Sequence, residues 1–200
     1  MQTRQLTHIF RYECADHNEL LADVYTFNEF AKRLEKQAKS LHKNDQKKRD
    51  KYVGDGFELF CEILFHSFPY DTRLGIANYK PTVVDAPGID GTGIGLNGRP
   101  AVVQIKYRAD PTHNLKGEDL GFYFSWETFK KYGVSVDDKN NILVVTGGKN
   151  INNFLRQVTD GSVRCIGRDG IRKLVDNNVP FWNDFRQVWN EQIEELRVAK

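Results

Sequence analysis

The strongest constraint on the fold is a β-hairpin signal in the middle of the chain. Residues 89–96 and 100–108 both read as extended segments, and Asn97-Gly98 between them is a dipeptide typical of tight hairpin turns. Glycines alternate along the first segment, and each is a place where a β-bulge costs little: Gly91, Gly93 and Gly95. We therefore expect the two segments to pair as antiparallel strands.

The second strand of this hairpin carries polar side chains where a buried strand is normally apolar. Side chains alternate along a strand, so Gln104 and Lys106 share one face. A three-residue loop at 97–99 would place Asp90 opposite Lys106, on the same face. A two-residue turn would place Asp90 opposite Ile105 instead, and one bulge would then restore the convergence. The register stays open, but we expect an acid, an amide and an ammonium to come together.

The segments around the hairpin predict a mixed α/β domain with a central sheet covered by helices. Residues 27–43 and 57–68 carry apolar side chains at helical spacing. The run ILVVTGG, residues 142–148, is apolar and β-branched, as is typical of a buried parallel strand. Helix and strand patterns alternate after it. We expect an N-terminal basic helical extension over residues 1–44 and the main domain over residues 45–200.

The helix upstream of the hairpin has a carboxylate at the border of its apolar face. Glu58 lies about 100° from Phe57 around the helix axis, on the flank of the apolar side, and Glu62 is expected to lie further out. A carboxylate at the border of a core must reach water or hold a charged group. Glu58 is therefore the helix residue expected to join a polar site.

The oxygen atoms of this constellation suit a divalent cation. Mg²⁺ prefers oxygen ligands, and Asp90 offers a carboxylate, Gln104 an amide oxygen and Ile105 a backbone carbonyl. Lys106 is placed to orient a water molecule and to stabilise negative charge that develops on a phosphate. A metal and a phosphate would thus complete a strand face that is otherwise costly to bury.

This arrangement resembles the PD-(D/E)XK nuclease superfamily and is most similar to its Mrr-type restriction endonuclease branch. The similarity covers roughly residues 45–180 and rests on three stretches: Gly88-Ile89-Asp90-Gly91, Val103 to Arg108, and Gly56-Phe57-Glu58. The resemblance implies a restriction-endonuclease-like α/β fold with a mixed sheet, and an endodeoxyribonuclease that uses Mg²⁺, with Mn²⁺ as a substitute. It implies a catalytic set of Glu58, Asp90, Gln104 and Lys106, with Glu58 as a further metal ligand.

The sequence departs from the superfamily pattern at two points. Gln104 replaces the second acid, and the Pro-Asp dipeptide is absent, so that Asp85 competes with Asp90. We prefer Asp90 because Asp85 lies too far along the chain for the hairpin to bring it opposite Gln104 and Lys106. Two alternatives therefore stay open: a catalytically degenerate DNA-binding module of the same fold, and a structural or partner-binding α/β protein.

A basic segment begins within the first predicted helix and continues beyond it. From residue 32 to residue 51 there are nine basic and three acidic side chains, a net charge of +6 (nine minus three), although the whole chain carries only +2. Such a segment fits a DNA phosphate backbone, and the alternative is a solvated helix face. The residues expected to bind DNA are Lys43, Lys47, Lys48, Arg49, Lys51 and Arg108.

The expected partner is double-stranded or branched DNA. Because cutting both strands needs two active sites, a homodimer or higher homo-oligomer is also expected. No apolar run is long enough to span a bilayer, the first residues lack the apolar stretch of a signal peptide, and the three cysteines are scattered. These features predict a soluble protein in the cytoplasm.

Overall fold

The computed structural model describes residues 18–69, 71–82, 88–120, 130–135, 138, 141–159 and 163–198. The chain divides into two compact units. Met1–Ile63 and Arg172–Lys200 form the first, and Leu64–Ile171 forms the second. The first unit thus joins both ends of the chain, whereas the sequence suggested a boundary after residue 44. The expected division into a basic extension and a catalytic domain stays a prediction.

The first unit is built around an aromatic core. It contains η3 (Asn18–Leu21), α1 (Phe27–Leu41), most of α2 (Gln46–Ser67), the end of α6 (Arg168–Val175), and α7 (Val179–Val198). The rings of Phe30 and Phe60 stack with centroids 5.1 Å apart. Around them pack further buried rings from α1, α2 and α7: Phe27, Phe57, Phe181, Trp182 and Phe185.

Both predicted N-terminal helices are present, and the largest difference is at the start of the second. The first runs over Phe27–Leu41 and starts at Thr26, whose side chain accepts a hydrogen bond from the Glu29 amide at 3.2 Å. The second starts at Gln46, eleven residues before the first apolar residue of the predicted helix, because Asp45 caps it. The Asp45 carboxylate accepts a hydrogen bond from the Lys48 amide at 3.0 Å.

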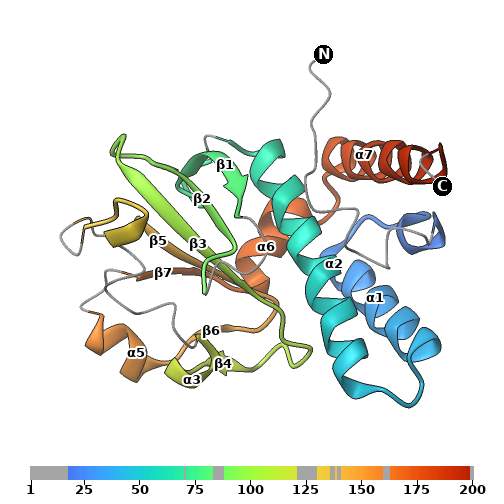
Figure 1. Ribbon diagram of the computed structural model, residues 1–200, viewed down its shortest axis with the longest axis horizontal. Coiled ribbons are helices and arrows are strands. Elements are labelled where there is room, and N and C mark those ends of the chain that lie inside the picture. The colour runs from blue at the N-terminus through green and yellow to red at the C-terminus, as the bar shows by residue number, and fades with distance from the viewer. Residues whose placement is uncertain are drawn as a thin grey trace. The chain divides into compact units, whose positions relative to one another are not determined.

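The second unit contains a five-stranded mixed sheet, which confirms the mixed α/β class (Figure 1). The strands lie in the order β1 (Ile76–Pro81), β2 (Gly91–Gly95), β3 (Pro100–Lys106), β5 (Ile142–Thr146) and β7 (Val163–Ile166). β1, β2 and β3 pair antiparallel, whereas β3, β5 and β7 pair parallel. The buried ILVVT strand is therefore parallel to its neighbours, as its composition predicts.

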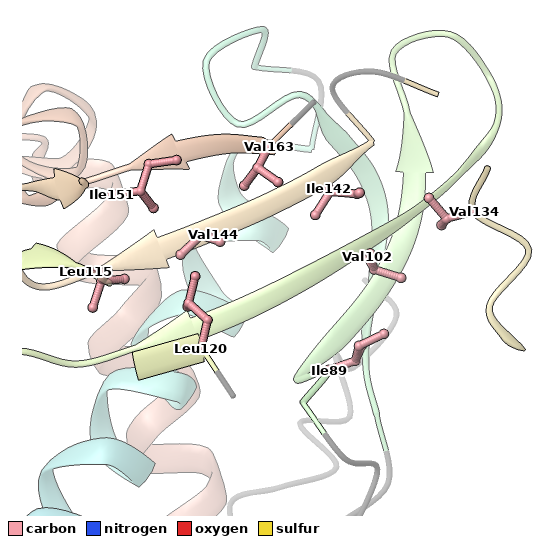
Figure 2. Packing of buried hydrophobic residues seen from close by; sticks show 9 residues of the cluster. All are labelled: Ile89, Val102, Leu115, Leu120, Val134, Ile142, Val144, Ile151 and Val163. Atoms are coloured by element: carbon pink, nitrogen blue, oxygen red, sulfur yellow. The ribbon is translucent and has the colours of Figure 1, made fainter. Parts of the chain in front are cut away.

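One face of this sheet packs against short elements that follow the strands. β4 (Asn114–Leu115) pairs with β6 (Asn150–Ile151), and α3 (Gly117–Leu120) and α5 (Asn153–Val158) flank them in sequence. Figure 2 shows Leu115 and Leu120 beside Val144 of β5, in one apolar cluster with Val102 of β3. Because Val102 and Gln104 are two residues apart on β3, Gln104 lies on this covered face.

The hairpin has a three-residue loop, one of the two lengths that the sequence left open, but this loop lies one residue earlier than residues 97–99. The Gly95 amide donates to the Arg99 carbonyl at 2.8 Å, which leaves residues 96–98 as the loop. Gly98 has a φ of 77°, a conformation that glycine adopts without strain. Neither of the two registers that the sequence left open, with Asp90 opposite Lys106 or opposite Ile105, is present, because Gly91 is the register partner of Val103.

A bulge lies at the base of the hairpin. The Asp90 amide donates to the Val103 carbonyl at 2.9 Å, although Gly91 is the residue in register with Val103. Two residues of the first strand thus face one residue of the second, which is the pattern of a β-bulge.

In the part of the chain that the structure describes, no helix has the length and apolarity needed to cross a bilayer.

Candidate functional site

The Asp90 carboxylate closes the end of the β2–β3 ladder. Its Oδ2 accepts a hydrogen bond from the Ile105 amide at 2.5 Å and one from Gln104 Nε2 at 2.7 Å. A side-chain oxygen therefore takes the place that a backbone carbonyl would occupy if the ladder continued. The acid and the amide converge as the sequence predicts, although the bulge brings them together rather than the expected register.

Burial governs the protonation of Asp90. Removal from water raises the pKa of Asp90 to about 6, while the Ile105 amide, the charge of Lys106 and the Gln104 amide each act to lower it. Among the described residues Lys106 makes no ion pair with Asp90, so its ammonium acts through space. The carboxylate is thus short of positive charge for its degree of burial.

Gln104 leaves one polar atom without a partner. The side chain is 6% exposed, its Nε2 is bonded to Asp90, and its Oε1 is buried with no hydrogen bond. An unsatisfied buried oxygen is costly, and a bound cation would remove that cost. Asp90, Gln104 and the Ile105 carbonyl therefore fit an oxygen-liganded cation in the chemistry of their donors, with a turn of the Gln104 amide.

No cluster of three or more His, Cys, Asp or Glu side chains that could hold a metal occurs among the described residues. One carboxylate and one amide are fewer anionic ligands than a tight magnesium site normally has. Any ion held here therefore needs a further carboxylate or the oxygens of a bound phosphate.

The fourth predicted site residue lies in the other compact unit. Glu58 is half-buried on α2, as expected for the border of a core, and it belongs to the first unit, whereas Asp90, Gln104 and Lys106 belong to the second. Its participation in the site stays a prediction.

Glu62, which was expected to lie further out than Glu58, is instead buried. It is 2% exposed, its Oε1 has no hydrogen-bond partner, and burial raises its pKa to about 7. The prediction failed because α2 is buried on most sides from Gly56 to Phe65: Leu59 and Ile63 are as buried as the predicted apolar stripe. Those two apolar residues, on the side where Glu62 lies, are the signal that could have shown it.

A second charged group lies just beyond the carboxyl end of β3. Asp119 is ion-paired with Arg108, bonds His113 Nε2 at 3.2 Å and accepts from the Lys116 amide at 2.8 Å. Burial alone would raise the pKa of Asp119, but these partners outweigh it and hold the pKa at about 2. Sequence reasoning named Arg108 but missed Asp119, because nothing in the local pattern shows which loop meets it.

The other residues expected to bind DNA lie just before and within the first turns of α2. The three lysines at 43, 47 and 48 are exposed. Lys51 is ion-paired with Asp55, and Arg49 donates to the Lys43 carbonyl at 3.2 Å and to Gln46 Oε1 at 2.6 Å. Asp85, the competitor of Asp90, lies outside the described residues.

Comparisons with protein-family models, curated proteins and solved structures found no match to this chain. Any functional assignment must therefore come from the residues and their geometry.

Proposed function

We propose that this chain is a magnesium-dependent endonuclease that hydrolyses DNA phosphodiester bonds on a restriction-endonuclease-like fold. The observation that carries the proposal is the meeting of Asp90 and Gln104 beside Lys106, with a half-buried carboxylate and an unpaired amide oxygen. A site that is short of positive charge and lined by oxygen atoms is suited to a hydrated divalent cation.

The sheet topology supports the same assignment. An antiparallel hairpin is followed by parallel strands, and Asp90 and Lys106 lie near one end of the β2–β3 pair, which is where we propose that the substrate phosphate binds. The resemblance to the PD-(D/E)XK superfamily assigns its acid and its Gln-x-Lys motif to these same positions. Fold alone does not fix function, so the assignment depends on the site.

Each residue has a chemical role in the proposed reaction. Ionised Asp90 supplies the negative charge, and Gln104 Oε1 and the Ile105 carbonyl supply neutral oxygen ligands. Lys106 orients the attacking water and stabilises the charge that develops on the phosphate oxygens. Glu58 is proposed as a further carboxylate ligand. When bound, Mg²⁺ would polarise the phosphate and lower the pKa of a coordinated water.

Plasmid cleavage tests the proposal directly. Supercoiled DNA is incubated with the protein and Mg²⁺ or Mn²⁺, with EDTA as control, and nicked and linear products are measured. Wild type should cut only with metal, and Lys106→Ala should lose activity while keeping its fold and its DNA affinity. Lys80→Ala, an exposed lysine on β1, is the matched control and should cut normally. Normal cutting by Lys106→Ala would refute the assigned site.

A DNA-binding module without catalysis is the second candidate. It is favoured by Gln104, which presents Nε2 rather than an oxygen to Asp90 and adds no negative charge. In that case the wild-type protein binds duplex DNA with a steep salt dependence but leaves plasmid intact with either metal.

If the protein does cut both strands, a homodimer or higher oligomer is the expected assembly, because two active sites are then needed.

A further inference from the structure

A buried tyrosine of β1 lies beside the bulge at the base of the hairpin, which we call the Asp90 bulge. Tyr79 is 5% exposed and comes two residues before Pro81, the register partner of Gly91. Such diagonal positions on neighbouring strands are within reach of an aromatic side chain. Tyr79 Oη lies 3.4 Å from the Asp90 carbonyl oxygen. The neighbouring strand β1 therefore contacts the residue on which the proposed site depends.

A bulge in β1 accounts for the placement of this tyrosine. The register between β1 and β2 shifts between Ala77 and Lys80. Two residues, Asn78 and Tyr79, thus face the single residue Gly93. Asn78 has a φ of 52°, a left-handed conformation that asparagine adopts more readily than most residues do. Bulges redirect side chains, and this one includes the tyrosine whose ring reaches over β2.

The glycine at position 91 leaves room for the ring. A Cβ on Gly91 would lie 2.5 Å from both Cζ and Oη of Tyr79, a distance at which one of the two residues must move. The ring is itself held in place, because it stacks on Phe65 of α2 with centroids 4.5 Å apart and an angle of 15° between the planes. Phe65 and Tyr79 belong to the same compact unit. Gly91 is thus packed against a ring that the core holds.

The Asp90 backbone is held at both of its polar groups. Its amide donates to the Val103 carbonyl at 2.9 Å, and its carbonyl accepts from the Thr82 amide at 3.0 Å. The Tyr79 hydroxyl adds a longer contact to the same carbonyl. With the backbone held, only the side-chain torsions of Asp90 remain to place the carboxylate on the Ile105 amide.

We infer that Tyr79 is a positioning residue of the proposed metal site, whose ring holds the Asp90 bulge so that the carboxylate meets Gln104. Residues that support metal ligands commonly change metal affinity by about 10- to 100-fold when they are replaced. Tyr79 acts through Asp90 and takes no part in the chemistry itself. The inference rests on the proposed function, because it assigns a support to the same site.

Binding of Mn²⁺ to the protein without DNA, followed by the EPR signal of the free ion, tests the inference without cleavage. Tyr79→Leu removes the ring atoms that meet Gly91 and should weaken Mn²⁺ binding by about tenfold or more. Tyr79→Phe keeps the ring and should stay within about threefold of wild type, because the hydroxyl contact is long. Tyr52→Leu, the same change at a buried tyrosine of the first unit, is the matched control and should stay within about twofold.

A methyl group at position 91 tests the same contact from the other side. Gly91→Ala should weaken Mn²⁺ binding about as much as Tyr79→Leu, because the methyl group and the ring cannot both keep their places. The double variant should lie within about twofold of the weaker single variant, since leucine lacks the atoms that would meet the methyl group. Gly117→Ala, where an added Cβ has no described atom within 4 Å, is the control and should bind like wild type.

Further measurements separate positioning from a loss of folding or of function. Thermal melting shows which variants fold, and Gly91→Ala carries the test if Tyr79→Leu does not fold. A folded variant of either kind that binds Mn²⁺ within about twofold of wild type overturns the inference, while the proposed function stands. If wild type binds no more Mn²⁺ than Asp90→Asn does, the proposed metal site fails and the positioning role falls with it. In single-turnover cleavage, Tyr79→Leu should lower the rate by about tenfold or more and leave duplex affinity in EDTA within about twofold.

Discussion

Two aspartates at the carboxyl end of β3 show opposite electrostatics. Asp90 is held by an amide side chain and a backbone amide, and its pKa is raised to about 6 by burial. Asp119 is held by Arg108 and His113, and its pKa is lowered to about 2. Asp119 thus has its countercharge inside the protein, whereas Asp90 lacks one at close range. A cation added to this region should bind at Asp90 and not at Asp119.

The contrast between Asp90 and Asp119 is tested most directly by removing the charge of each carboxylate in turn. Asp90→Asn should lower the rate of DNA cleavage by about 10³-fold or more, because it removes the only carboxylate of the hairpin. Asp119→Asn should lower it by less than about tenfold at saturating DNA, because Asp119 only positions Arg108. Single-turnover cleavage of a labelled duplex in Mg²⁺ measures both. Equal losses in the two variants would show that the contrast has no catalytic meaning.

The next largest effect is expected in the stability of the metal-free protein, which should depend on pH through the ionisation of Asp90. Because the folded-state pKa of Asp90 is raised from 3.8, ionisation at higher pH costs stability, which falls between about pH 4 and pH 6. The rise in the pKa of Asp90 from 3.8 to about 6 corresponds to a loss of at most roughly 3 kcal/mol in the free energy of unfolding. In EDTA, Asp90→Asn should therefore raise the free energy of unfolding at pH 7.5 and change it little at pH 3.5. Urea unfolding at the two pH values measures this, and a loss of stability at pH 7.5 would contradict it.

Asp119 should behave in the opposite sense. Its pKa is lowered in the folded state, so its contribution is present at neutral pH and is lost as the pH falls from about 4 through 2. Asp119→Asn should lower the Tm at pH 7 by about 3 °C, and the difference should shrink towards pH 2. Differential scanning calorimetry across this pH range provides the measurement. A constant difference at all pH values would show that packing, not charge, is responsible.

Added metal should change the Tm by about as much as Asp119→Asn does. At ten times its dissociation constant, Mg²⁺ stabilises the protein that binds it by about 1.4 kcal/mol. That corresponds to a rise of roughly 3–5 °C in the Tm of wild type and of Asp119→Asn at pH 7.5. Asp90→Asn should show no rise. An equal response of all three proteins would place the metal elsewhere.

The sequence predicted the elements of the site better than their pairing. Alternation along residues 100–106 and the Asn97-Gly98 turn were enough to bring Asp90 towards Gln104. The loop position was not predictable and the bulge was only one of the possibilities, because several registers bury the same apolar side chains and only the whole sheet selects among them. The sequence also predicted that Glu62 would lie outside the core. This prediction was wrong, because the burial of α2 depends on elements far away in sequence.

Asp119 shows a different limit of sequence reasoning. Its partners lie 6 and 11 residues earlier in the chain, His113 and Arg108, and they meet it only because the segment after β3 turns back through β4 into α3. Hydrophobic periodicity carries no information about such a turn, since the residues concerned are polar and half-exposed. Charge patterns in loops therefore identify candidates for ion pairs but do not choose between them.

The side chain that closes the β2–β3 ladder also makes one backbone position a natural reporter. The amide proton of Ile105 is held by Asp90 and not by another peptide group, so its exchange with deuterated water should follow what happens to that carboxyl group. Protonation, substitution or capture of an ion would each change the protection of this single amide, while its neighbours on β3 serve as an internal reference. One resonance in an NMR spectrum would then register occupancy of the site before any DNA is added.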